Sequence, residues 1–265
     1  MILAIDVGNT ETVIGVFRGL EPLYCWRIAT RRDRTGDEYT VLLQGFLDRA
    51  LAPAHGPVRR AILASVVPVL DRAWAQACRG LASEFRVLGP SDRLPVRLDV
   101  DAPHEVGADR IANTLAASEL YHRNTVVVDL GTATTFDCIT ADGVFMGGVI
   151  APGPRAGIER LTSVATQLPL VEIAPPERVI GRRTLACVQS GAFFAIVDSI
   201  DGIVRRILEE WAPENPLVLA TGGLAELIGP HCRMVDRVEP VLTLIGLAVA
   251  DRHLGREGSG GESED

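Results

Sequence analysis

One pattern occurs twice in the chain: an apolar strand that ends in Asp-x-Gly and is followed closely by threonine. The first copy is ILAIDVGNTETV at residues 2–13, and the second is VVVDLGTATTFD at residues 126–137. A glycine in such a turn lets backbone N–H groups approach an anion, and the hydroxyls add donors. The aspartate would repel a phosphate unless a cation lay between them. The matched pair therefore predicts two similar lobes that grip a nucleotide from both sides.

Composition narrows the class of protein. The 265 residues suit one large domain or two ordinary ones, at ~150 residues per domain. An apolar content of 47% with 23% charged residues is typical of a globular protein with a good core. A net charge of −8 argues against nucleic-acid binding as the main function. No apolar run approaches the ~20 residues of a membrane span, and the start of the chain reads as a strand and not as a signal peptide. We therefore expect a cytoplasmic protein with no nucleic-acid or membrane partner.

Two residue types restrict the chemistry further. The five cysteines are odd in number and form no C-x-x-C, which predicts reduced core residues and not disulfides or zinc ligands. All 26 basic residues are arginine. The absence of lysine excludes a Walker-A lysine, a Schiff-base lysine and the strand lysine of protein kinases. If the chain transfers a phosphoryl group, metal ions, arginines and backbone N–H groups must neutralise the charge.

Periodicity and turn residues predict alternating strands and helices. We expect a meander of strands at 2–6, 12–17 and 23–28, a strand–turn–strand over 126–140, and further strands at 61–67, 85–88, 96–100, 143–150 and 217–220. We expect helices at 36–50, 70–81, 105–121, 158–166, 184–211 with a break near Gly191, and 242–253. The predicted organisation is an N-terminal lobe at 1–118, a C-terminal lobe at 119–253 and a disordered tail at 254–265, because the last ten residues lack large apolar side chains.

Three other stretches are candidates for function. Residues 107–110 form the first turn of a helix, where Asp109 is either a residue that suits the helix dipole or a base that faces a cleft. At Thr221-Gly222-Gly223 a backbone could lie against a flat ring or a phosphate. Arg31, Arg32 and Arg34 belong either to a solvated loop or to a mobile lid.

Six motifs follow one another in a specific order. They are IDVGNT at 5–10, EVGADR at 105–110, VVDLGTATTFD at 127–137, GGVIAPG at 147–153, IGRRT at 180–184 and ATGG at 220–223. With them the chain closely resembles type III pantothenate kinase, of the acetate and sugar kinase/Hsp70/actin superfamily, over residues 1–253. The resemblance implies an α/β fold of two actin-like (ribonuclease H-like) lobes with an ATP cleft between them. It also implies ATP-dependent phosphorylation of pantothenate to 4′-phosphopantothenate, the first step of coenzyme A biosynthesis.

The resemblance implies roles for individual residues. The first ATP-phosphate loop would be formed by Asp6, Val7, Gly8, Asn9, Thr10, Glu11, Thr12 and Val13, with Asp6 in indirect contact with Mg²⁺. Thr132 would contact ATP, and Asp129 would bind a monovalent cation, K⁺ or NH₄⁺. The pantothenate site would be lined by Gly107, Ala108, Asp109 and Arg110, with Asp109 as the base. Thr184 matches a residue that the family contributes across a homodimer interface to the neighbour's pantothenate, and the long apolar helix at 185–200 also favours a homodimer.

The chain departs from the family pattern at three positions. Val100 stands where many relatives carry a tyrosine, Glu11 replaces a common asparagine, and Pro154 replaces a usual leucine. None of these positions is one of the aspartates, so they bear on substrate affinity more than on reaction class. Two other hypotheses stay open: a kinase of the same fold for a sugar or carboxylate acceptor, and a nucleotide-binding regulator without turnover. The turn at 107–110 with Thr184 argues against the first, and the retained Asp109 and Asp129 argue against the second.

Overall fold

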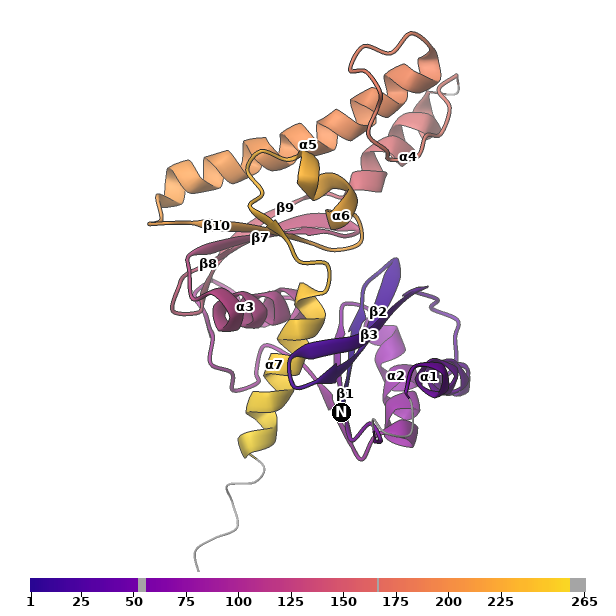
Figure 1. Ribbon diagram of the computed structural model, residues 1–265, viewed down its shortest axis with the longest axis vertical. Coiled ribbons are helices and arrows are strands. Elements are labelled where there is room, and N and C mark those ends of the chain that lie inside the picture. The colour runs from indigo at the N-terminus through magenta and orange to yellow at the C-terminus, as the bar shows by residue number, and fades with distance from the viewer. Residues whose placement is uncertain (52–55, 166, 258–265) are drawn as a thin grey trace, which may run out of the picture. The chain divides into compact units, whose positions relative to one another are not determined.

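The computed structural model describes residues 1–51, 56–165 and 167–257. The chain divides into two compact units (Figure 1). The first unit contains Met1–Tyr121, Gly143–Phe145 and Leu242–Asp265, and the second contains His122–Asp142 and Met146–Val241. The expected two-lobe α/β organisation is therefore present. One boundary differs, because the C-terminal segment from Leu242 onwards belongs to the first unit.

The first unit is built on a sheet in the order β3-β2-β1-β4-β5. Its strands are β1 (Ile2–Val7), β2 (Glu11–Arg18), β3 (Glu21–Ala29), β4 (Arg60–Ser65) and β5 (Glu84–Val87). The first three strands form the predicted antiparallel meander, and β4 runs parallel to β1. The hairpin between β1 and β2 places Asp6 opposite Val13, so the first Asp-x-Gly turn lies at the carboxyl end of β1.

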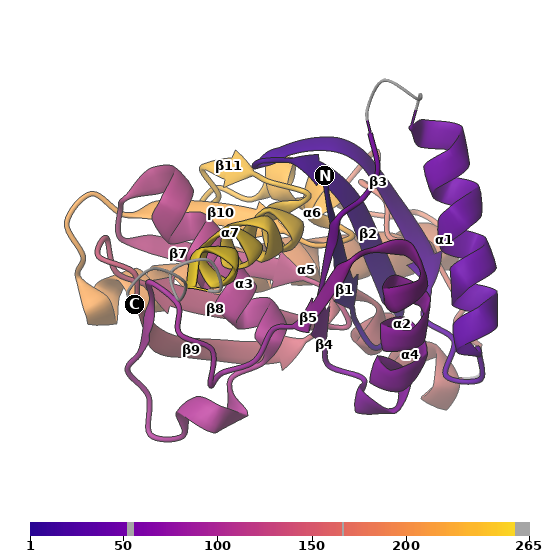
Figure 2. The same ribbon diagram turned by 90° about the horizontal axis from the view of Figure 1, so that it is seen from below.

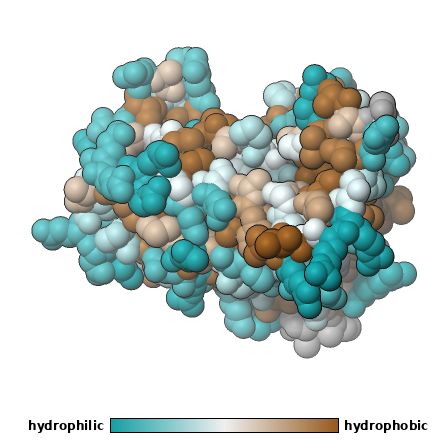
Figure 3. All heavy atoms as spheres, turned by 90° about the horizontal axis from the view of Figure 1, so that it is seen from above, coloured by the Kyte–Doolittle hydropathy of each residue, from teal (hydrophilic) through white to brown (hydrophobic). Residues whose placement is uncertain are grey.

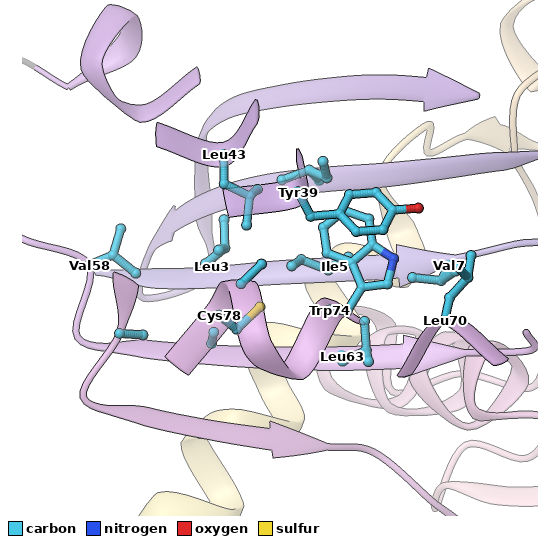
Figure 4. Close-up of a cluster of buried hydrophobic side chains, with 14 of the residues drawn as sticks. Leu3, Ile5, Val7, Tyr39, Leu43, Val58, Leu63, Leu70, Trp74 and Cys78 are labelled. Atoms are coloured by element: carbon cyan, nitrogen blue, oxygen red, sulfur yellow. The ribbon is translucent and has the colours of Figure 1, made fainter. Parts of the chain in front are cut away.

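Helices α1 (Gly36–Ala50) and α2 (Pro68–Leu81) pack on one face of this sheet (Figure 2). A capping box between Thr35 and Glu38 fixes the start of α1, and Pro68 begins α2, where proline is favourable. The rings of Tyr39 and Trp74 stack with their centroids 3.9 Å apart. Figure 4 shows this pair beside Val7, so buried aromatic side chains support the end of β1.

Helix α7 (Leu242–Glu257) packs on the opposite face of the sheet, where Gly15 of β2 lies against Leu244 of this helix. Helix α7 runs beside α3 (Ala108–Tyr121), and Gly246 allows this contact, since a Cβ there would collide with the backbone of Ala112 (Figure 1). The expectation that 242–253 belong to the C-terminal lobe is therefore wrong. Residues 254–257 are helical and not disordered, because α7 continues through them, and 258–265 lie outside the described residues.

The second unit contains the strands β7 (Thr125–Leu130), β8 (Ala133–Ile139), β9 (Val144–Pro152), β10 (Leu217–Thr221) and β11 (Arg237–Val238), in the order β11-β10-β7-β8-β9. β7 and β8 form the second Asp-x-Gly hairpin, and β10 runs parallel to β7. The first residues of β9, Val144 and Phe145, belong to the first unit, where they pair with β6 (Arg97–Leu98). The repeat of the strand–turn–strand plan is confirmed.

The helices of the second unit are α4 (Pro154–Val164), α5 (Thr184–Trp211) and the short α6 (Ala225–Ile228), which the sequence did not predict. Helix α4 begins at 154 and not at 158, because Pro154 occupies its first turn, where proline is favourable. Helix α5 is continuous, so the predicted break near Gly191 is wrong. A glycine inside a helix costs about 1 kcal/mol, which the packing of Phe193 and Val197 in the core offsets.

By length and composition alone, α5 is apolar enough to cross a membrane, and about a third of its most apolar window is buried. Its buried residues Ser190, Phe193, Val197, Ile200 and Val204 repeat at helical spacing, and most of them belong to the core of the second unit. A core helix passes the same test of length and composition. The packing therefore places one face of α5 in the core of this unit.

The five cysteines are free thiols, as predicted, but only Cys78, Cys138 and Cys232 are buried. Burial raises the pKa of Cys78 and of Cys232 to about 12. Cys25 and Cys187 are exposed, so the expectation of a core position is wrong for these two. Cys25 lies on β3, which is at the edge of its sheet.

Candidate active site

The first unit holds the turn between β1 and β2, which we call the first phosphate turn (residues 7–13). Its tight bend needs Gly8, because the N–H of Gly8 donates to the carbonyl oxygen of Glu11 at 3.0 Å and a Cβ would lie 2.9 Å from that oxygen. Thr30, just after β3, donates its hydroxyl to the carbonyl oxygen of Gly8 at 2.8 Å and its N–H to that of Thr10 at 2.9 Å. The residue that follows β3 thus fixes the turn through hydrogen bonds to the backbone of the turn.

The residues predicted for ATP binding in this turn differ in what they can offer a ligand. Val7 and Thr12 are fully buried, and the Thr12 hydroxyl lies 2.9 Å from that of Thr30. Glu11 forms an ion pair with Arg27 at 2.9 Å. The side chains that face solvent are those of Asn9 and Thr10. Val7 and Thr12 therefore build the turn, while its tip is available for binding.

The predicted substrate turn lies at the start of α3. The Oδ1 atom of Asp109 accepts a hydrogen bond from the N–H of Arg110 at 2.9 Å, and a Cβ on Gly107 would collide with that Oδ1. The missing side chain of Gly107 is what allows the carboxylate to fold back over the turn. Burial raises the pKa of Asp109, although the N–H and the positive charge of Arg110 act in the opposite direction. Asp109 thus lies in the first helical turn and is also a carboxylate of perturbed pKa, which is typical of functional sites.

The substrate turn and the first phosphate turn are connected through Val66, which follows β4. Its N–H donates to the carbonyl oxygen of Val7 at 3.0 Å, and its Cγ1 would lie 3.8 Å from a Cβ on Gly107. Since β1 and β4 are parallel, their carboxyl ends lie at the same edge of the sheet. The fold therefore brings Asp109 to the edge of the sheet where β1 ends at Val7, the residue after Asp6.

The other residues of the substrate turn are packed into the first unit. Ala108 is buried, and the guanidinium carbon of Arg110 lies 5.0 Å from the centre of the Phe145 ring, a cation–π contact. The carbonyl oxygen of Arg110 accepts the hydroxyl of Thr114 at 2.8 Å. These contacts fix the helix start that presents Asp109.

In the second unit, Asp129 is the last residue but one of β7 and lies in register with Thr221, the last residue of β10. Gly222 follows with a φ of +93°, and a Cβ there would collide with Oδ1 of Asp129. Gly153, from the motif after β9, lies against the carbonyl oxygens of Gly131 and Thr132. Three motifs that are far apart in sequence thus meet at the second Asp-x-Gly turn, and Gly131 and Thr132 remain exposed there.

The resemblance implies Mg²⁺ near Asp6 and a monovalent cation at Asp129, and the carboxylates of the structure can be compared with both expectations. Within the described ranges there is no group of three or more His, Cys, Asp or Glu residues that could hold a metal ion. Mg²⁺ is commonly bound by one or two carboxylates together with substrate phosphates, and not by a cage of protein ligands. Asp6 fits that arrangement. At the second Asp-x-Gly turn, Gly222 packs directly against the Asp129 carboxylate.

Thr184 is the exposed first residue of α5. The preceding segment folds onto the helix, since the carbonyl oxygen of Val179 accepts the Ser190 hydroxyl at 2.7 Å and that of Gly181 accepts the Cys187 thiol at 3.3 Å. Large apolar side chains beside Thr184 are exposed: 67% for Val179, 83% for Ile180 and 56% for Leu185.

Two functional contacts were missed from the sequence. One is the pair of hydrogen bonds from Thr30 to the first phosphate turn, and the other is the contact of Gly222 with Asp129. The first could have been found from the hairpin register, because pairing of Glu11 with Ala29 places the next residue beside Thr10. The second depends on the parallel pairing of β7 with β10, whose partners are about 90 residues apart in sequence, and no local signal indicates it.

The family model that matches this chain and the two curated sequences compared with it belong to one family. Residues 2–206 match the family model of type III pantothenate kinase. The chain is 42% identical over 254 residues to a type III pantothenate kinase of Moorella thermoacetica, covering 94% of this chain and 98% of that protein. It is 42% identical over 250 residues to one of Syntrophotalea carbinolica, covering 94% and 97%.

Solved structures show the same fold at low sequence identity. A candidate transcriptional activator of the Baf family from Campylobacter jejuni has a TM-score of 0.59 at 17% identity, covering 96% of this chain and 99% of that one. The activator of 2-hydroxyisocaproyl-CoA dehydratase from Clostridium difficile, with bound ADPNP, has a TM-score of 0.55 at 10% identity, covering 100% and 99%. A ROK hexokinase from Thermus thermophilus has a TM-score of 0.50 at 14% identity, covering 94% and 97%.

Proposed function

This chain belongs to the type III pantothenate kinase family, and from that membership we propose how its residues divide the work of phosphorylating pantothenate with ATP. The reaction, the first step of coenzyme A biosynthesis, needs an oriented hydroxyl, bound phosphates and neutralised charge. The observation that carries the proposal is the start of α3. There Gly107 lets the Asp109 carboxylate fold back over the turn, and burial raises the pKa of that carboxyl.

Asp109 acts on the acceptor. Its carboxylate takes the proton of the terminal hydroxyl of pantothenate, the hydroxyl oxygen bonds to the γ-phosphorus, and the bond from that phosphorus to the bridging oxygen of ADP breaks. A base with a raised pKa is closer to the operating pH and therefore accepts the proton more readily. Gly107, Ala108 and Arg110 hold the pantothenate beside it.

The first phosphate turn and Asp6 act on the nucleotide. The exposed tip, Asn9 and Thr10, offers polar donors to the phosphates, and Thr30 keeps the tip in place. Mg²⁺, when bound with ATP, supplies charge neutralisation at the phosphates. Asp6 would contact it indirectly.

Asp129 and Thr132 are the residues of the second unit that we propose act on the nucleotide. The Asp129 carboxylate holds a monovalent cation, K⁺ or NH₄⁺, and the exposed Thr132 contacts ATP. Support comes from the motifs that meet at this turn, since Gly222 packs against the Asp129 carboxylate and Gly153 against the backbone of Gly131 and Thr132.

We also propose a cytoplasmic homodimer in which Thr184 contacts the pantothenate of the partner. Exposed apolar residues near Thr184 support this: Leu161, Val164, Leu170, Val179, Ile180 and Leu185. Brown, hydrophobic patches are visible on the face over which α5 runs (Figure 3). A monomer in light scattering at micromolar concentration would remove this part of the proposal, and a dimeric Thr184→Ala variant with a raised KM for pantothenate alone would support it.

The decisive assay combines ATP, Mg²⁺ and pantothenate, with and without K⁺. It compares the intact chain with Asp109→Asn and Asp129→Asn. We expect 4′-phosphopantothenate from the intact chain, a loss of at least ~100-fold in kcat for Asp109→Asn, and loss of K⁺ stimulation for Asp129→Asn. ATP binding with turnover of a different acceptor would favour a kinase for that acceptor, and ATP binding without any turnover would favour a regulator.

A further inference from the structure

We propose that Arg32 binds the terminal phosphates of the nucleotide and is the side-chain cation of the first phosphate turn. This rests on the proposed function only for the identity of the nucleotide. No basic residue occurs within residues 7–13, and the chain contains no lysine. A turn that binds the phosphates of ATP through its tip would otherwise present no positive side chain of its own.

The segment that carries Arg32 is fixed to the first phosphate turn at its beginning. The hydroxyl of Thr30 donates to the carbonyl oxygen of Gly8 at 2.8 Å and the N–H of Thr30 donates to the carbonyl oxygen of Thr10 at 2.9 Å. The Thr12 hydroxyl lies 2.9 Å from that of Thr30. Arg32 therefore follows, by two residues, a position bound directly to the turn.

The same segment is also fixed at its end. The Tyr39 hydroxyl donates to the carbonyl oxygen of Arg31 at 3.2 Å, and Thr35 forms the capping box of α1 with Glu38. The guanidinium of Arg34 lies over the Tyr39 ring at 5.9 Å. Since both ends are held, little backbone conformational entropy remains to be lost when Arg32 binds a ligand.

The side chain of Arg32 points to the tip of the turn. Its Nη2 lies 3.4 Å from Oδ1 of Asn9, a long hydrogen bond between two exposed side chains. A guanidinium has five N–H donors, so most of its donors remain for a ligand. Arginine is suited to phosphate because two parallel N–H groups can bind two of its oxygens.

The charges around the turn favour this assignment. Glu11, the acid within the turn, is paired with Arg27 at 2.9 Å, so Arg27 is already neutralised. In the part of the chain that the structure describes, no carboxylate forms an ion pair with Arg32. Arg32 therefore brings an uncompensated positive charge to the place where the phosphates are proposed to bind.

Arg31 provides a matched control. It is the neighbouring arginine and its side chain is exposed, but its contacts with the rest of the unit are made by its backbone. Substitution at 31 and at 32 removes the same charge from the same short segment. A general electrostatic effect would therefore appear equally in both variants, whereas a direct contact would appear only at 32.

The test uses the full chain and measures ATP and adenosine binding by calorimetry, together with steady-state kinetics. We expect Arg32→Ala to weaken ATP binding about tenfold, the loss typical of one charge-assisted hydrogen bond, and to leave adenosine binding within about twofold. Arg31→Ala should change neither by more than about twofold. Arg32→Lys should restore part of the ATP affinity, since it restores the charge without the fork.

Equal effects at 31 and 32, or an equal loss of ATP and adenosine binding in Arg32→Ala, would overturn the inference. The outcome is separable from the proposed function. If the intact chain binds ATP but does not phosphorylate pantothenate, the proposed acceptor is wrong, and the comparison of Arg32→Ala with Arg31→Ala for ATP binding still decides the role of Arg32.

Discussion

Gly222 lies against the carboxylate of Asp129, with no room for a side chain between them. Its φ of +93° lies in a region that L-residues rarely adopt, and a Cβ would collide with Oδ1 of Asp129 and lie 2.7 Å from the N of Leu130. Gly222 directly follows β10, and Asp129 is the last residue but one of β7, which runs parallel to β10. The glycine of one motif thus allows its backbone to lie directly against the aspartate of another motif.

We expect Gly222→Ala to lower the free energy of unfolding by about 2 kcal/mol or more, because the backbone strain and the collision add. K⁺-stimulated activity should also fall, since the collision displaces the Asp129 carboxylate. Urea denaturation and the kinase assay measure the two effects. As a control, Gly191→Ala replaces an exposed glycine within α5 that has open space around it, and it should stabilise the protein by about 0.5–1 kcal/mol. A neutral Gly222→Ala would contradict the described contact.

Asp109→Asn should lose activity and gain stability. Burial raises the pKa of Asp109, so the ionised form is disfavoured in the folded protein and costs stability at neutral pH. The amide removes that cost while keeping the shape, which is typical of residues retained for function at the expense of stability. Thermal denaturation at pH 7 should give a higher Tm for Asp109→Asn. A lower Tm would indicate that the carboxylate stabilises the fold.

The raised pKa of Asp109 predicts two pH effects, one on stability and one on activity. Because a folded-state pKa above the ordinary value penalises the charged form, the stability advantage of Asp109→Asn is largest above the raised pKa and fades as the pH falls towards 3.8. The kcat/KM of the intact protein should fall as the pH falls through that raised pKa, because the base becomes protonated. A flat acid limb would argue against Asp109 as the base.

Thr30→Val should loosen the first phosphate turn. The substitution keeps the shape of the side chain but removes the hydrogen bond to the carbonyl oxygen of Gly8 and the partner of the Thr12 hydroxyl. We expect a loss of about 1–2 kcal/mol in stability and a severalfold rise in the KM for ATP, with the KM for pantothenate unchanged. Thr40→Val, which removes only a hydroxyl bonded within α1, is the control and should leave both KM values unchanged.

Arg60→Gln should destabilise the first unit. Asp251 is 1% exposed and accepts a hydrogen bond from Nε of Arg60 at 2.7 Å, so the substitution leaves a buried carboxylate without its ion pair. We expect a loss of about 2–3 kcal/mol at pH 7 by chemical denaturation. Since burial raises the pKa of Asp251, and removing Arg60 raises it further, the loss should shrink as the pH falls and the carboxyl becomes protonated.

Two further variants test whether the loss in Arg60→Gln comes from the buried charge of Asp251. Arg60→Gln with Asp251→Asn should recover most of the lost stability, because the uncompensated charge is gone. Arg205→Gln, which breaks an exposed pair with Glu209 on α5, should cost less than about 0.5 kcal/mol. An equal loss from Arg60→Gln and Arg205→Gln would mean that burial does not strengthen the first pair.

Much of the fold could be predicted from local sequence. The bounds of α1 and α5, and the strands beside both Asp-x-Gly turns, follow from apolar spacing, caps and glycine, which act over a few residues. The errors have physical causes of longer range. Glycine 191 does not break α5 because core packing outweighs its low propensity, and Pro154 begins a helix because its position, and not its identity alone, decides its effect.

The sequence by itself determined the two Asp-x-Gly hairpins and the helix start at Asp109, because each of these is specified by residues that are neighbours along the chain. Only the tertiary structure decided that α7 packs in the first unit, that Thr30 and Arg32 reach the first phosphate turn, and that Gly222 lies against Asp129. These contacts join residues that are distant in sequence. They depend on strand pairing and on close helix packing, which no local pattern encodes.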